Sequence, residues 1–139
     1  MTAPSIATGR IRSAQGFTLI ELMVVMTIIV TLATIAMVQY RQSVQLARES
    51  VLKDDLFKMR DAIDQYYADK TQYPSTIDDL VSAGYLRSLP KDPITNTTDS
   101  WQAVPAEPDP NNPAVASGVY DVKSGSDQTA MDGSRYSDW

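Results

Sequence analysis

Glu21 is the only charged residue in an otherwise apolar run from Phe17 to Met37. A carboxylate inside a membrane helix costs about 2.5 to 3.5 kcal/mol on insertion scales, so such a group is normally paired. Cleavage of the peptide bond between Gly16 and Phe17 would create a partner. The freed amino group of Phe17 would be a cation four residues from Glu21, on the same face of a helix and near the positive end of its dipole.

Two geometries of this ion pair remain open. In the first, Glu21 neutralises the amino terminus of its own chain within the first helical turn. In the second, Glu21 of one chain meets Phe17 of a neighbouring chain and sets the axial register as the chains stack. Either geometry needs the cut after Gly16, so the chemistry of this segment predicts a processed chain.

The segments around the proposed cut differ sharply in composition. Residues 1–16 are polar, contain Arg10 and Arg12, and have no hydrophobic run, so they are interpreted as a leader. Residues 17–37 provide roughly the 20 apolar positions that a membrane-spanning helix requires. An ordinary secretory signal is cut after its apolar core. Here the junction lies before the run, so the apolar segment would become the new N-terminus.

The apolar run continues into a longer predicted helix. No proline or glycine occurs from Phe17 to Thr71, which predicts a continuous helix to about Lys70. Tyr73 precedes a proline and is disfavoured in a helix. The second half carries a stripe at spacings of three, four and seven, formed by Leu52, Leu56, Met59, Ile63, Tyr66 and Tyr67. The charged residues on the opposite side are interpreted as a solvated or inter-subunit face.

Residues beyond this helix predict a short helix and a small sheet. Ser75 to Asp78 matches a capping box, and Gly84 can close the helix that follows. Residues 100–104 and 118–123 have the composition of short strands that pair, joined by a loop over residues 105–116. The predicted fold class is therefore α+β, with a long N-terminal helix packed on a small antiparallel sheet. Residues 38–139 form the globular head, which includes the second half of the long helix.

Composition excludes several classes of function. The 139 residues contain 12 Lys and Arg against 17 Asp and Glu, so the formal net charge is −5, which gives nucleic-acid binding no electrostatic support. The chain has no histidine and no cysteine. The commonest general base and the commonest zinc ligands are therefore missing, and no nucleophile–base pair stands out. A non-enzymatic role is predicted over a membrane-anchored enzyme or binding module.

The run from Gly16 to Val25, Gly-Phe-Thr-Leu-Ile-Glu-Leu-Met-Val-Val, resembles the processing motif of the type IV pilin and type II secretion pseudopilin superfamily. The resemblance implies that a prepilin peptidase cuts after Gly16 and methylates the amino group of Phe17. It favours the ion pair between neighbouring chains for Glu21. It also implies a type IV pilin-like fold. The proline and glycine common in the family's apolar helix are replaced here by Val38 and Val30.

The C-terminal half resembles the major, G-type pseudopilin over residues 65–74, 84–86, 89–93, 119–122 and 124–127 and at Trp139. This implies a structural subunit of a periplasmic pseudopilus that drives type II secretion. The implied partners are further copies of the chain, a prepilin peptidase, an inner-membrane assembly platform, minor pseudopilins and membrane lipid. The implied location is the bacterial inner membrane, single-pass with a periplasmic head, and then the filament. A type IV pilin for adhesion, motility or DNA uptake is the alternative.

The resemblance also implies a calcium loop near the C-terminus. Asp127 matches a family acidic position, but the expected adjacent acidic pair aligns with Ser134 and Arg135. Calcium takes six to eight oxygen ligands. Asp127 and Asp132 are the predicted side-chain ligands for Ca2+, with backbone carbonyls completing the shell. The competing interpretation is a polar loop held by turns and by Trp139.

Overall fold

The computed structural model describes residues 16–107, 110–111 and 118–139. Their elements are α1 (Leu19–Lys70), α2 (Asp78–Ser82), β1 (Gln102–Pro105), β2 (Val119–Lys123) and the 3-10 helix η2 (Tyr136–Asp138). The chain divides into two units at Gln39, and each is described separately. The predicted leader up to residue 15 and much of the predicted loop 105–116 lie outside the described residues.

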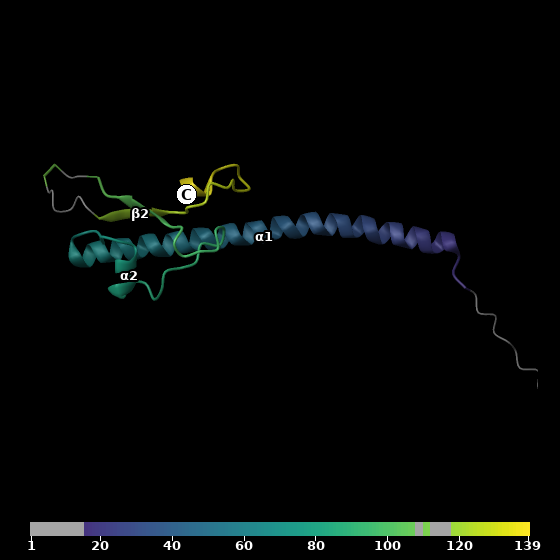
Figure 1. The fold of residues 1–139 in the computed structure, drawn as a ribbon, viewed down its shortest axis with the longest axis horizontal. Coiled ribbons are helices and arrows are strands. Elements are labelled where there is room, and N and C mark those ends of the chain that lie inside the picture. Colours follow the sequence, from purple (N-terminus) through teal and green to yellow (C-terminus); the bar gives the residue numbers. More distant parts are fainter. Residues whose placement is uncertain (1–15, 108–109, 112–117) are drawn as a thin grey trace, which may run out of the picture. The chain divides into compact units, whose positions relative to one another are not determined.

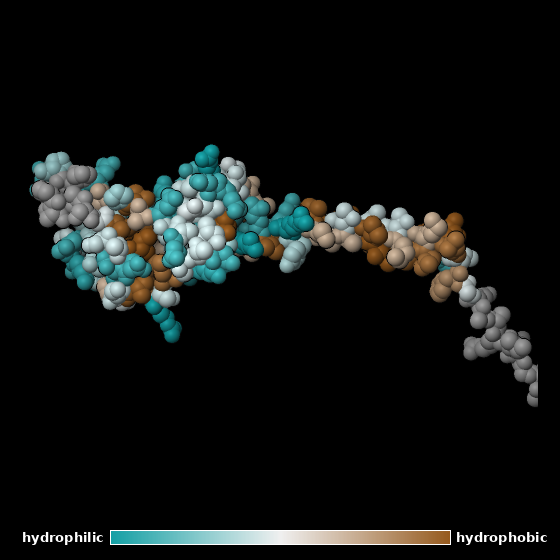
Figure 2. Space-filling model, viewed as in Figure 1, coloured by the Kyte–Doolittle hydropathy of each residue, from teal (hydrophilic) through white to brown (hydrophobic). Residues whose placement is uncertain are grey.

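The first unit contains the apolar beginning of α1. It holds an 18-residue window of mean hydropathy 2.4, of which no part is buried, and by length and composition this helix could cross a membrane. Figure 2 shows hydrophobic surface along this stretch. Its threonines are satisfied locally, since Thr27 Oγ1 donates to the Met23 carbonyl at 2.8 Å and Thr34 Oγ1 to the Val30 carbonyl at 2.8 Å. Hydroxyls bonded in this way are tolerated in an apolar medium.

In the second unit, the core forms on α1. The predicted stripe is confirmed for Leu52, Leu56, Met59 and Ile63, which are all buried, while Tyr66 and Tyr67 are only half-buried. The other core members are Ala62, Leu80, Trp101, Val119, Val122, Ala130 and Tyr136. In Figure 1 the strands run along one side of this half of α1 and α2 lies on the other. The helix therefore supplies the surface on which the remaining elements pack.

The sheet consists of the two antiparallel strands β1 and β2, as predicted. Its register pairs Ala103 with Val122 and Val104 with Asp121, and it shifts between Val104 and Pro105. A proline has no N–H to donate, so it is accommodated at such an irregularity in a sheet. Val119 and Val122 face the core, which accounts for the apolar residues at these positions of β2.

The ends of both helices follow from local chemistry. The residue after α1, Thr71, has a φ of 57°, and Tyr73 then stacks on Tyr67 with ring centroids 4.5 Å apart. Gly84 closes α2 as predicted, with a φ of 85° in the left-handed region that glycine tolerates.

The capping box predicted from Ser75 to Asp78 is wrong by one position. The carboxylate that reaches back is that of Asp79, which accepts the Thr76 N–H at 2.9 Å, and α2 has no side-chain N-cap. This register places Ile77 and Leu80, three positions apart, on the core. Burial of the apolar pair therefore decides the start of the helix over the sequence motif.

Candidate functional site

The Gly16–Phe17 bond lies in exposed backbone ahead of the helix. Both residues are outside α1, and the Phe17 side chain is 88% exposed. A Cβ built on Gly16 meets nothing within 4 Å. Among the described residues, no side chain covers this bond and no helical hydrogen bond holds it, which is the state in which a peptidase can bind and cut it.

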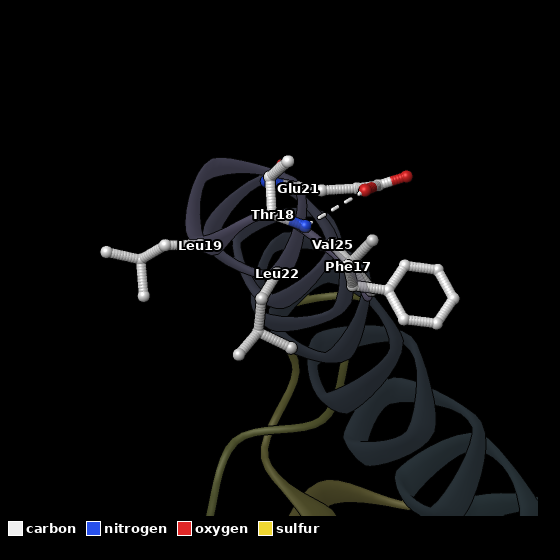
Figure 3. A pocket seen from close by; sticks show the side chains of 6 residues that line it. All are labelled: Phe17, Thr18, Leu19, Glu21, Leu22 and Val25. Atoms are coloured by element: carbon white, nitrogen blue, oxygen red, sulfur yellow. Dashed lines mark hydrogen bonds between the residues drawn. The ribbon is translucent and has the colours of Figure 1, made fainter. Parts of the chain in front are cut away.

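Thr18 and Glu21 form a capping box at the start of α1. The Glu21 N–H donates to Thr18 Oγ1 at 3.2 Å, and the Thr18 N–H donates to Glu21 Oε2 at 3.4 Å (Figure 3). This reciprocal pair satisfies two of the backbone donors that a helix leaves open at its N-terminus. The cap was not predicted, although the Thr-x-x-Glu spacing from Thr18 to Glu21 is a signal for it in the sequence.

The helix begins at Leu19, which corrects the expectation that it starts at Phe17. The two N-terminal residues of the motif stay outside the helix because the Thr18 side chain occupies the capping position. Phe17 and Glu21 nevertheless extend to the same side in Figure 3. In this uncut chain the Phe17 nitrogen is an amide, so the ion pair with Glu21 stays a prediction in both of its geometries.

Glu21 is surrounded by exposed apolar side chains. Together with Phe17, Leu19, Leu22 and Val25 it borders an open hollow of about 560 Å³ (Figure 3). Within the described part of the chain, Glu21 Oε1 accepts no hydrogen bond. The arrangement presents one free carboxylate oxygen on an apolar surface. It can bind a cation brought by another chain, and the surrounding apolar groups would exclude water and strengthen that contact.

The predicted calcium loop folds as a short hairpin around its acidic tip. Thr129 and Arg135 form an isolated antiparallel bridge, and Asp132 lies in the turn between them. Asp132 Oδ1 accepts the Ser134 hydroxyl at 2.6 Å and its N–H at 2.9 Å, and these bonds lower the pKa of the Asp132 carboxyl. Asp127 is exposed on the segment before the hairpin.

The donor chemistry of this loop covers only part of a calcium shell. Asp127 and Asp132 are two oxygen-bearing side chains, against the six to eight oxygens that the ion takes. No group of three or more acidic, histidine or cysteine side chains is placed to hold a metal among the residues that the structure describes. Backbone carbonyls would have to supply the remainder, so calcium binding stays a prediction.

Glu49 connects the C-terminal segment to α1, and sequence reasoning missed it. This buried carboxylate accepts the Tyr136 hydroxyl at 2.8 Å, the Met131 N–H at 2.9 Å and the Gln45 side-chain amide at 3.2 Å, all through Oε1. Burial, and then the bond to Glu49, raise the pKa of Tyr136. Glu49 therefore anchors the hairpin to α1.

Arg60 makes a second connection from α1 to the C-terminal segment. Its Nε donates to Asp121 at 2.6 Å, and its terminal nitrogen donates to the backbone carbonyls of Val122 at 3.1 Å and Trp139 at 2.8 Å. The Trp139 ring packs edge-on against Tyr136, with centroids 5.1 Å apart, and its Nε1 donates to Ser134 Oγ at 2.6 Å. These contacts agree with the interpretation of a loop held by turns and by Trp139.

A capped apolar helix that follows a Gly-Phe-Thr motif and leads into a small α+β head is typical of type IV pilin-like proteins. In agreement, the family model "Prokaryotic N-terminal methylation motif" matches residues 11–37. The type II secretion system core protein G of Pseudomonas aeruginosa is 36% identical over 101 residues, which cover 61% of this chain and 71% of that protein. The chain belongs to the type II secretion system core protein G family and is a pseudopilin.

Other members of that family show the same extent of similarity. Core protein G of Klebsiella pneumoniae is 34% identical over 57% of this chain and 68% of its own length. Core protein G of Escherichia coli K12 is 32% identical over 59% of this chain and 68% of its own length. No solved structure matches the chain.

Proposed function

We propose that the chain is the repeating, non-enzymatic subunit of a pseudopilus in type II protein secretion, and that Glu21 directs its assembly. The observation that carries the proposal is the free Glu21 oxygen on the exposed apolar first turns of α1. Family membership supports the secretion role. Peptidase cleavage after Gly16 and methylation of Phe17 supply the cationic amine that this carboxylate lacks.

The exposed apolar surface of α1 must be covered first by membrane lipid and then by neighbouring subunits of the filament. Before assembly, the helix spans the inner membrane once, with the head in the periplasm, so that lipid tails cover its side chains. An inner-membrane assembly platform then extracts the subunit and adds it to a filament begun by minor pseudopilins. In the filament, neighbouring helices replace lipid. Since this exchange gives little hydrophobic gain, close packing and polar pairs such as Glu21 with the amine decide the register.

Deletion of the gene separates this function from that of a surface pilus. We expect secreted proteins to remain in the periplasm of the deletion strain, while surface pili and motility stay normal. A plasmid-borne copy should restore secretion. Loss of surface pili with unchanged secretion would contradict the proposal and select the type IV pilin alternative.

Substitution of Gly16 by leucine is expected to leave the precursor uncut. Because no described residue lies within 4 Å of a Cβ at this position, the head should fold normally and the defect should lie in recognition by the peptidase. Intact-protein mass spectrometry of membranes from cells with a matching prepilin peptidase measures the result. Ser13→Leu adds the same side chain three positions from the bond and should be cut. Equal processing of the two variants would contradict the assigned site.

Calcium binding by Asp127 and Asp132 is tested by thermal unfolding of the full chain in detergent. If the ion binds only the folded head, calcium at 100 times its dissociation constant stabilises it by about 2.7 kcal/mol. We expect a higher melting temperature in calcium than in EDTA, and no difference for Asp127→Asn. Asp138→Asn removes a nearby carboxylate and serves as the matched control. Identical melting of the wild-type chain in calcium and EDTA would contradict the prediction.

A further inference from the structure

A groove in the second unit begins where the apolar run of α1 ends. It has a volume of about 680 Å³, with Tyr40, Arg41 and Arg48 of α1 on one wall and Gln128 and Thr129 of the C-terminal segment on the other. Arg41 and Arg48 are seven positions apart, which is about two helical turns, so they lie on one face of α1 roughly 10 Å apart along its axis. The groove thus presents two guanidinium groups together.

Both arginines are without a protein partner. In the described parts of the chain, neither Arg41 nor Arg48 takes part in a salt bridge or hydrogen bond. They are the only charged residues between Glu21 and Glu49 in the sequence. The next acid on the helix, Glu49, is buried and already accepts three hydrogen bonds. The positive charge of the groove is therefore available to an external anion.

The sequence places this groove next to the membrane boundary. The apolar run ends at Met37, and Tyr40, which is 69% exposed, follows three positions later. Tyrosine is enriched at membrane interfaces. Side chains of an α-helix lean toward its N-terminus, which for Arg41 and Arg48 is the direction of the apolar run. Outside the groove, acidic residues of the head outnumber basic ones, so an anionic leaflet would on balance repel the rest of the head.

We propose that this groove binds the headgroup of an anionic phospholipid of the phosphatidylglycerol type. Arg41 and Arg48 bind the phosphate oxygens, for which the planar guanidinium offers paired donors. Gln128 and Thr129 face the glycerol hydroxyls from the opposite wall. The contact holds the head against the leaflet until the subunit is extracted. It rests on the proposed function in one respect only, that the subunit is in a membrane before assembly.

The test uses the mature full-length chain in nanodiscs of phosphatidylcholine with a minority of phosphatidylglycerol. Native mass spectrometry counts the phosphatidylglycerol molecules that stay bound to each chain. We expect one retained molecule with a preference over phosphatidylcholine. Arg41→Gln with Arg48→Gln should lower that preference about 25-fold, since each arginine near an anionic surface contributes a factor of about five. Arg87→Gln, an exposed arginine outside the groove, should leave it unchanged.

Three results would overturn the proposal. Equal loss in Arg87→Gln would show a general charge effect. The second result comes from a titration with inorganic phosphate in pure phosphatidylcholine nanodiscs, followed by the NMR chemical shifts of the arginine side chains. If these shifts reach a plateau at millimolar phosphate, the groove is a site for free phosphate. Unchanged lipid retention in the double variant, with loss of self-association, would assign the arginines to acidic residues of a second copy. Because lipid retention is measured on single chains, it is scored independently of filament formation and therefore of the proposed function.

Discussion

Replacing Glu21 by alanine is expected to abolish filament assembly while cleavage after Gly16 continues. In the filament, the carboxylate would meet the Phe17 amine of a neighbouring chain among apolar side chains. Removing one member of a buried ion pair costs about 3 to 5 kcal/mol, because the remaining charge is left uncompensated. A loss of that size at every contact lowers subunit affinity by a factor of about 150 to several thousand. Electron microscopy of sheared filaments and mass spectrometry of the membrane-bound subunit measure assembly and cleavage separately.

Thr18→Val is the matched control, because the structure gives Glu21 a local role as well. This variant removes the hydroxyl half of the capping box but keeps the carboxylate. The loss of a cap costs about 1 kcal/mol, so assembly should weaken only several-fold. If Thr18→Val and Glu21→Ala impair assembly equally, capping alone explains Glu21 and the pair between chains is refuted. Normal filaments from Glu21→Ala would refute it as well.

The long helix and its buried stripe could be predicted because their signals are local. A stretch without proline or glycine and a regular apolar spacing are enough to place Leu52, Leu56, Met59 and Ile63 on one face. The same reasoning located both strands to within two residues, since short apolar clusters between turn-rich segments have few alternatives. Boundaries were less accurate, and α2 shifted by one residue because burial of Leu80 outweighed the motif.

The residues that hold the C-terminal segment could not be predicted in this way. Glu49 and Arg60 lie on the long helix and look like members of a solvated charged face. Their partners are far along the chain, since Tyr136 is 87 positions from Glu49 and Trp139 is 79 positions from Arg60. Polar residues of this kind become buried only when the tertiary fold brings donors to them. Helical periodicity carries no information about such a donor.

Asp92 shows the same limit within a loop. It is fully buried, its Oδ2 accepts the Ser124 hydroxyl at 2.6 Å, and its Oδ1 accepts the Ile94 N–H at 2.8 Å. The bond to Ser124 fixes the start of the segment that was predicted to bind calcium. A carboxylate in a proline-flanked loop indicates only a turn, so its partner 32 positions away becomes visible only in the folded chain.

Replacing Glu49 by alanine is expected to produce the largest loss of stability in the head. The substitution leaves the buried Tyr136 hydroxyl and the half-buried Met131 N–H without their acceptor. A buried group left unsatisfied costs about 1 to 3 kcal/mol, and the half-buried one adds to this. A total of about 3 kcal/mol is a large part of the stability of a small domain. For a head of about 100 residues it lowers the melting temperature by roughly 15 °C. Circular dichroism of the full chain in detergent measures this shift.

Two further variants separate the hydrogen bonds of Glu49 from packing and charge. Glu49→Gln keeps an acceptor oxygen of the same shape and should recover most of the stability. Tyr136→Phe removes the hydroxyl that donates to Glu49 and accepts from Gln45 but leaves the Glu49 carboxylate in place, so it should cost only about 1 to 2 kcal/mol. Because Glu49 and Tyr136 are in contact, the double variant Glu49→Ala with Tyr136→Phe should be less damaging than the sum of the two single changes. A melting temperature for Glu49→Ala within a few degrees of wild type would show that the C-terminal hairpin is held in another way, and Arg60 and its bond to Trp139 would then carry the attachment.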